Sequence, residues 1–372
     1  MVFKTPSGWR VPHAATLFSL LWLLGGSAVL ADTHKVPDLL DLPARADVRA
    51  QVAPQLALAR VGERVVAVGV RGNVLLSDDF GRNWRQARTV PVSVALTDVH
   101  FGDSDRGWAV GHSGVILHSA DGGDTWMRQL DGRQAAAIVL DEASARLAAG
   151  DPGAARAVRD AQRMVEEGPD KPFLGVYFAD DQRGYAVGAY GLALVTEDGG
   201  ATWHSLAGRI PNARGNHLYQ VQVRGRDILI AGEQGVLFRS QDGGESFAAI
   251  PTPYAGTYFG VVVIDTETML AYGLRGNAWR SHDGGQRWVQ VPIDQEITLT
   301  AGRLLSDGSV VLADESGRLL RSTDGARSFV ALPEHPGSGL TGMVETSAGD
   351  LVLSGGRGLA RLEHRKLVAE AK

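Results

Sequence analysis

Six aspartates recur along the chain in the same short sequence context: Asp79, Asp121, Asp198, Asp242, Asp283 and Asp324. The copy around Asp121 reads "SADGGDTW", and every copy has a Ser or Thr two residues before its aspartate. A carboxylate in such a loop could ligate calcium, transfer protons in catalysis, or accept hydrogen bonds from the backbone of its own turn. These three roles require different supporting residues.

The neighbours of the aspartates favour the structural role. A calcium loop of the EF-hand type needs oxygen ligands at alternate positions and a closing glutamate, and no copy has that set. A catalytic acid repeated six times has no mechanistic purpose. We therefore expect no catalytic residue, no metal site and no cofactor, and interpret the motif as a turn. Its structural residues are Ser77, Asp79, Gly81, Trp84, Ser119, Asp121, Gly123, Trp126, Thr196, Asp198, Gly200, Trp203, Ser240, Asp242, Gly244, Phe247, Ser281, Asp283, Gly285, Trp288, Ser322, Asp324 and Phe329.

The spacing of the motif predicts a repeat architecture. Successive central aspartates are 42, 77, 44, 41 and 41 residues apart. Each copy follows two short apolar strands joined by a glycine turn, as in "WAVGHSGVILHS", and a seventh strand pair from Leu351 has no motif after it. Four strands per unit of about 40 residues are typical of a propeller blade. The chain is thus predicted to be all-β, a seven-bladed β-propeller with the motif as its hairpin turns.

The last unit lacks a fourth strand, whereas the N-terminal side has a spare segment. We expect residues 32–52 to close the last blade, with residues 38–42 pairing there, because closure removes exposed sheet edges. An open solenoid is the alternative. The propeller is predicted to span residues 53–364, followed by a C-terminal tail over residues 365–372.

The long 77-residue interval contains an alanine-rich insertion over residues 131–170. Its composition predicts a helical hairpin between blades 2 and 3, with the two helices joined near Gly150. We expect the hairpin to rise from the face opposite the motif turns. It is either a lid or docking arm, or a neutral insertion in a tolerant loop.

The first 31 residues resemble a signal peptide, with Lys4 and Arg10 before an apolar run and small residues at Val29 to Ala31. An uncleaved membrane anchor is the alternative. We therefore expect an exported, periplasmic protein that can associate with the membrane. The chain has no cysteine and a formal charge of −5, so disulfides are excluded and nucleic-acid binding is not expected.

The pattern Ser-x-Asp-x-Gly-x-x-Trp resembles the Asp-box, or BNR, repeat of β-propellers. Together with the "YAVG" and "GWAVGHSG" strand pairs, it resembles the photosystem II stability and assembly factor family, over residues 53–363. Departures from the box occur at Thr196, Phe247, Ala326 and Phe329. The resemblance implies a non-catalytic protein that binds a membrane protein or a membrane-complex subunit. Photosynthetic members of the family bind a newly made reaction-centre subunit.

Candidate binding residues lie on the turns opposite the boxes, where the residue before the turn glycine varies. Arg71, Arg275 and Arg357 occupy this position, as does Tyr190, and Arg209 and Arg214 lie on the connection after the third box. Guanidinium groups suit a carboxylate-bearing partner. The alternative is that these arginines are merely solvated turn residues. No small-molecule substrate is expected.

An Asp-box glycoside hydrolase of the sialidase type is the alternative function. It needs an arginine cluster and a glutamate paired with its nucleophile. Glu233 and Glu315 occupy comparable turns but lie two blades apart, so the sequence contains no clear catalytic pair.

Overall fold

The computed structural model describes residues 37–102, 105–333 and 339–367. The predicted signal peptide, residues 1–31, lies outside this part of the chain. Within the described part, no helix is long and apolar enough to cross a membrane.

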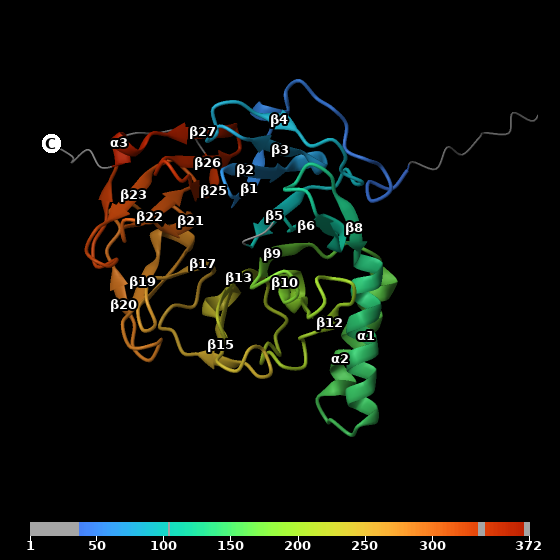
Figure 1. Ribbon diagram of the computed structural model, residues 1–372. Coiled ribbons are helices and arrows are strands. Elements are labelled where there is room, and N and C mark those ends of the chain that lie inside the picture. Colours follow the sequence, from blue (N-terminus) through green and yellow to red (C-terminus); the bar gives the residue numbers. More distant parts are fainter. Residues whose placement is uncertain (1–36, 103–104, 334–338, 368–372) are drawn as a thin grey trace, which may run out of the picture. The chain divides into compact units, whose positions relative to one another are not determined.

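Seven antiparallel sheets are arranged in a ring, as Figure 1 shows, and each is one blade of a β-propeller. Six blades have four strands and the seventh has three, with strand order following the sequence. The strands are, by blade, β1 Gln55–Val61, β2 Arg64–Gly69, β3 Val74–Ser77 and β4 Arg85–Gln86; β5 Leu96–Phe101, β6 Gly107–Gly111, β7 Ile116–Ser119 and β8 Met127–Leu130; β9 Phe173–Phe178, β10 Gly184–Gly188, β11 Ala193–Thr196 and β12 His204–Ser205; β13 Leu218–Arg224, β14 Asp227–Gly232, β15 Leu237–Ser240 and β16 Ala248–Ile250; β17 Tyr258–Val263, β18 Met269–Gly273, β19 Ala278–Ser281 and β20 Val289–Val291; β21 Leu299–Leu304, β22 Val310–Asp314, β23 Leu319–Ser322 and β24 Val330–Ala331; β25 Leu340–Glu345, β26 Leu351–Gly355 and β27 Gly358–Leu362. The predicted seven-bladed fold is confirmed.

The core lies between neighbouring blades, and the second strand is completely buried in blades 2, 3, 5, 6 and 7. Every residue of β6 is buried, as is every residue of β10. Strands that are buried on both faces read as short continuous apolar runs, as in the "WAVG" and "YAVG" sequences. Trp108 of β6 stacks on Phe178 of blade 3, with ring centroids 3.4 Å apart.

The seventh blade closes without the strand that we predicted. Residues 38–42 lie instead beside blades 1 and 2: Leu39 O accepts the N–H of Ser93 at 2.8 Å, and Leu40 is buried there. The physical reason is that Leu40 fits an apolar space between these blades, where Arg128 also donates to Leu40 O at 2.8 Å. Within the described part of the N-terminal segment, the short 3₁₀ helix η1, Ala50–Val52, contacts β27.

Side chains therefore hold the ring closed between blades 7 and 1. The hydroxyl of Thr341 donates to Gln55 O at 2.8 Å. Val65 of blade 1 packs with Val344 and Val352 of blade 7, and all three are buried. The sheet edge at β27 carries no fourth strand within the described residues.

The C-terminal boundary also differs from the prediction. Helix α3, His364–Leu367, belongs to the propeller, because Leu367 is buried in the core of blades 6 and 7. Arg321 donates to Leu367 O at 2.8 Å. The first residues of the predicted tail are thus packed, and residues 368–372 lie outside the described part.

The insertion forms the predicted helical hairpin, with α1 Gly132–Ala148 and α2 Ala154–Glu167. Asp131 begins α1 with a capping box, accepting from Arg133 N while Gln134 accepts from Asp131 N. The hairpin lies along the outer side of blade 3 (Figure 1), where α1 contacts β12.

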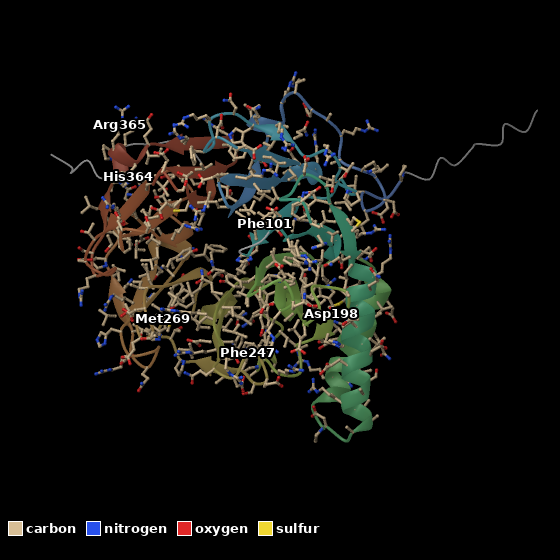
Figure 2. The ribbon with its side chains drawn as sticks, viewed as in Figure 1. Phe101, Asp198, Phe247, Met269, His364 and Arg365 are labelled. Carbon is tan, nitrogen blue, oxygen red and sulfur yellow. The ribbon has the colours of Figure 1, made fainter. Side chains whose placement is uncertain are left out.

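The box turns have one hydrogen-bond pattern. In the second box, Ser119 Oγ accepts the N–H of Gly123 at 2.9 Å and donates to Asp121 at 2.9 Å. The other oxygen of Asp121 accepts from the hydroxyl of Thr125 at 2.7 Å, and Trp126 Nε1 donates to Gly123 O. Figure 2 marks Asp198 and Phe247, which belong to the boxes of blades 3 and 4.

The same hydrogen bonds stabilise the ionised carboxylates. Bonds from the backbone and side chain of Asn83 lower the pKa of Asp79 to about 2, and the hydroxyl and N–H of Thr202 lower that of Asp198 to about 2.

The structure tolerates the departures from the motif at Thr196 and Ala326. The hydroxyl of Thr196 makes the same hydrogen bonds as the serine of the other boxes, and Ala326 adopts the left-handed conformation of the missing glycine, at φ 62°.

The box turns of blades 2 to 6 also receive a hydrogen bond from the preceding blade. The acceptor is the carbonyl of the first box glycine. Its donors are Arg64 for Gly122, Gln129 for Gly199, Tyr185 for Gly243, Arg239 for Gly284 and Arg280 for Gly325, at 2.7–3.2 Å. The boxes therefore connect neighbouring blades.

Two titratable residues of β5 lie where the inner strands surround the propeller axis. Asp98 accepts the N–H groups of Val99 and Val176, each at 2.9 Å, and burial raises its pKa to about 7. His100 Nδ1 accepts the N–H of Phe178 at 3.3 Å, and burial, followed by the charge of Arg303, lowers its pKa to about 4. Both residues thus favour their uncharged forms.

Replacing the box serine should test its structural role. Ser119→Ala leaves the buried N–H of Gly123 without its acceptor, so the free energy of unfolding should fall by about 1–3 kcal/mol. Ser119→Thr is the matched control, because Thr196 makes the same contacts in blade 3. Urea unfolding of both variants is the measurement, and equal stabilities would contradict the assignment.

The pair on β5 predicts a specific pH dependence. The raised pKa of Asp98 adds stability as pH falls from about 7 towards 4, whereas the lowered pKa of His100 removes stability as pH falls from 6.5 to about 4. The two effects oppose each other in the native protein. His100→Asn keeps an acceptor but loses the titration, so its melting temperature should rise, relative to that of the native protein, as pH falls from 7 to 4. Parallel profiles of melting temperature against pH for the two proteins would contradict this.

Candidate partner-binding surface

The turns opposite the boxes connect the second and third strands of each blade. In blades 1 to 5 the residue before the turn glycine has a positive φ: 59° at Arg71, 56° at Tyr190 and 55° at Arg275, with Ser113 and Gln234 alike. The following glycines are also left-handed, and Asn73 N donates to Val70 O across the first turn. These are type I′ turns, which favour Asn or Gly rather than Arg or Tyr. The unfavourable backbone suggests that these side chains have a role beyond folding.

Three of the predicted binding residues are exposed arginines on the turns between second and third strands, and Arg71 and Arg275, unlike Arg357, have the positive φ. Arg71, Arg275 and Arg357 extend from blades 1, 5 and 7. Among the described residues, none of the three has a carboxylate within 4.0 Å. Blades 7 and 1 are neighbours in the closed ring, so Arg357 and Arg71 lie on adjacent turns. The prediction that all three bind one partner remains a prediction.

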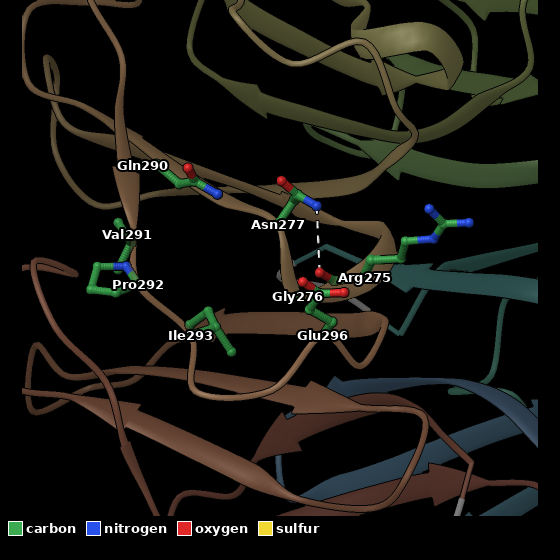
Figure 3. A pocket seen from close by; sticks show the side chains of 8 residues that line it. All are labelled: Arg275, Gly276, Asn277, Gln290, Val291, Pro292, Ile293 and Glu296. Atoms are coloured by element: carbon green, nitrogen blue, oxygen red, sulfur yellow. Dashed lines mark hydrogen bonds between the residues drawn. The ribbon is translucent and has the colours of Figure 1, made fainter.

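Arg275 borders a hollow of about 540 Å³ between blade 5 and its connection to blade 6. Figure 3 shows Val291, Pro292 and Ile293 on one side and the guanidinium of Arg275 directed away from them. The side chain of Asn277 holds the turn by donating to Leu274 O at 2.9 Å. The hollow thus combines an aliphatic wall with a cation at its edge.

Tyr190 belongs to a second cluster, on blade 3. Its side chain is 61% exposed. Its ring lies edge-to-face with that of His217, at 4.7 Å between centroids, and Lys171 Nζ lies 5.1 Å from the ring centroid. His217 Nδ1 also accepts the N–H of Tyr190 at 2.8 Å. An exposed aromatic ring held in a fixed position is the type of residue that anchors interfaces.

Arg209 and Arg214 have different surroundings, although both lie on the same connection. Arg209 donates to Gly244 O at 3.2 Å and lies 3.9 Å from a carboxylate oxygen of Glu245, so it is attached to the box turn of blade 4. Arg214 donates to Gln234 at 3.1 Å and has no carboxylate within 4.0 Å among the described residues. Arg214, unlike Arg209, is available to a partner.

The glutamates of the hydrolase alternative do not form a visible pair. Glu233 accepts the N–H of His217 at 2.8 Å, so part of its hydrogen-bonding capacity serves the local fold. A hydrolytic site needs a second carboxylate at a defined distance. No observation on this surface favours that reaction.

Sequence reasoning missed the contribution of the insertion to this surface. A groove of about 870 Å³ lies between α2 and residues 207–215, with Tyr190 among the residues that line it. Lys171 and Arg163 also line it. The chain has one long connection before blade 3 and another after it, which could have indicated that the two lie close together. Their contact joins segments some 50 residues apart, and sequence reasoning did not predict it.

Comparisons with known proteins agree with this fold. The family described as photosynthesis system II assembly factor YCF48 matches residues 78–151 and 154–294. Photosystem II assembly lipoprotein Ycf48 of Synechococcus sp. (strain CC9902) is 32% identical over 77 residues, which are 21% of this chain and 23% of that relative. The alignment therefore spans less than a quarter of the relative's length.

Two solved structures are similar over most of the chain. YCF48 from Cyanidioschyzon merolae has a TM-score of 0.62 at 16% identity, covering 84% of this chain and 96% of that one. A structure titled YCF48 bound to D1 peptide has a TM-score of 0.61 at 16% identity, covering 87% and 99%. At this identity the likeness concerns the fold. The family match spans more than half of the sequence, and the chain therefore belongs to the photosynthesis system II assembly factor YCF48 family.

Proposed function

We propose that this protein is an exported, non-catalytic β-propeller that binds a membrane protein through the face opposite its boxes. In this role it assists the assembly or operation of a membrane complex. The signal-like N-terminus supports export, and the description of the Synechococcus relative as a lipoprotein is consistent with a position at a membrane.

The observation that carries the proposal is the set of exposed turn arginines without carboxylate partners. The chain as a whole has a formal charge of −5, yet Arg71, Arg275 and Arg357 have no carboxylate within 4.0 Å among residues 37–102, 105–333 and 339–367. Guanidinium groups bind carboxylates through two parallel hydrogen bonds, which gives both affinity and orientation. A partner segment that carries carboxylates would satisfy them.

Family membership supports a protein ligand. A relative with the same fold has been solved bound to a D1 peptide, so the propeller is compatible with peptide binding in that protein. For this chain we propose a membrane-protein subunit as the partner. The exposed arginines would recognise a segment that extends from the membrane.

Changing the turn arginines should remove the partner. In affinity capture from crosslinked envelope extract, the variant with Arg71, Arg275 and Arg357 changed to Ala should recover about tenfold less partner than the native protein. The matched control changes Arg159 on α2, Arg224 at the end of β13 and Arg365 on α3, which are exposed but lie away from these turns, to Ala. The control should retain the partner. Equal recovery by both variants would overturn the arginine assignment.

A single change separates binding from stability. Arg71→Asn places a favoured residue in the left-handed turn, so the free energy of unfolding should rise by about 1 kcal/mol. Partner recovery should fall, because the guanidinium is lost. Chemical unfolding and affinity capture of the same protein are the measurements. A variant that is both more stable and fully active in binding would leave Arg71 without a role.

A further inference from the structure

The groove beside the helical hairpin is formed by elements that the propeller itself does not need. Its walls are α2 on one side and residues 207–215 on the other, with the turn at Tyr190 between them. Its volume of about 870 Å³ is large enough for several side chains of a bound peptide. The groove is separate from the hollow beside Arg275.

Packing within the hairpin explains why the groove stays open. Helix α1 packs on the propeller through Ala135, Ile138 and Val139, which join the core around Trp203. Helix α2 packs mainly on α1, and the small side chain of Ala161 is buried there. Because α1 is the layer in contact with the blade, α2 leaves a space between itself and the connection after blade 3.

The opposite wall is held in shape by its own hydrogen bonds. The side chain of Asn212 donates to Asn216 O at 2.9 Å and accepts the N–H of Asn216 at 3.0 Å. Arg214 is fixed by its bond to Gln234. A wall that is ordered before binding loses little conformational entropy when a partner arrives.

The groove combines apolar and cationic surface. Leu192, Ile210, Pro211 and Met164 contribute apolar side chains, next to the exposed ring of Tyr190. Five cationic and three carboxylate side chains also line it. The surface is therefore suited to an amphipathic segment rather than to a purely polar one.

The pairing of these charges shows which sign is unsatisfied. All three carboxylates have cationic partners: Asp160 lies 3.4 Å from Arg156, and Glu167 and Asp170 each lie 2.6 Å from Lys171. In contrast, Arg163 and Arg214 have no carboxylate within 4.0 Å among the described residues. The unsatisfied charge of the groove is positive.

We propose that this groove binds an acidic, amphipathic peptide segment of the protein partner. Carboxylates of the segment pair with Arg163 and Arg214, and its apolar side chains lie against Met164, Pro211 and the ring of Tyr190. The identification of the segment as part of a partner rests on the proposed function. The chemistry of the groove does not, so the two can be tested separately.

The first experiment uses the protein from residue 32 onward and a short fluorescein-labelled peptide of glutamate, leucine and serine. The native protein should bind it, and a variant with Arg163→Glu and Arg214→Glu should bind about tenfold more weakly. Arg159→Glu is the matched control on α2, because Arg159 is exposed but does not line the groove; binding should change by less than about twofold. Melting temperatures verify that all variants fold.

Several results would overturn the proposal. Equal weakening by Arg159→Glu would mean that general electrostatics, rather than the groove, attracts the peptide. Equal binding of a peptide with lysine in place of glutamate would exclude charge recognition. Binding of phosphatidylglycerol vesicles that is lost in the Arg163 and Arg214 variant, without binding of the acidic peptide, would identify a lipid surface instead.

The second experiment separates this proposal from the proposed function. A photo-crosslinking residue replaces Met164 in the groove or, as the control, the exposed Val165 beside it. Each variant is expressed in the source organism, so that its natural partners in the cell envelope are present. Crosslinking of an acidic partner segment from position 164 alone supports the proposal. Partner capture that depends on Arg71, Arg275 and Arg357 but gives no crosslink at 164 overturns the groove and leaves the proposed function standing. If no partner is captured, the proposed function fails, and the peptide experiment still decides the chemistry of the groove.

Discussion

The structure depends on one recurring interaction, the hydrogen bond from a side chain of one blade to the carbonyl of the first box glycine in the next blade. Between blades 1 and 6 it is made by arginine, glutamine or tyrosine donors, so the geometry of the turn matters more than the identity of the donor. The left-handed glycine directs its carbonyl outward, and the box carboxylate holds that conformation by accepting from its own turn. Six copies of a local motif therefore define hairpins, and five of them also define a contact between blades.

A rigid box face leaves the opposite face free to carry unfavourable features. The turns at Arg71, Tyr190 and Arg275 adopt a backbone conformation that Asn or Gly would adopt at lower energy. Their side chains make no ion pairs with described carboxylates. Such features are tolerated because the core between blades and the box contacts supply the stability. Polarity between the two faces is thus a physical property of the fold, and it favours binding on the face where stability is not required.

The parts of this architecture that sequence could predict are those encoded locally. The box at Ser119 and the strands around it lie within a few residues of each other, so the repeat predicted the blades, the turns and the helical hairpin correctly. Residues 38–42 were misplaced because a spare N-terminal segment and a missing fourth strand do not show where that segment packs, and Leu40 lies in an apolar site near Arg128. The groove between Arg163 and Arg214 could not be predicted, since it depends on how α2 stands relative to a connection about 50 residues later.

The contrast among the arginines bears most directly on function. Arg239 and Arg280 donate to box carbonyls, and Arg239 is also paired with Asp227 at 2.7 Å, so their charges serve the fold. Arg71, Arg163 and Arg357 have no such carboxylate partners among the described residues. An unpaired exposed cation contributes almost nothing to folding stability, whereas it can contribute a strong, oriented hydrogen bond once a carboxylate approaches. The same residue type therefore serves the scaffold on one side of the blades and stays available for recognition on the other. That division separates the arginines that stabilise the propeller from those that make no contact with a described carboxylate.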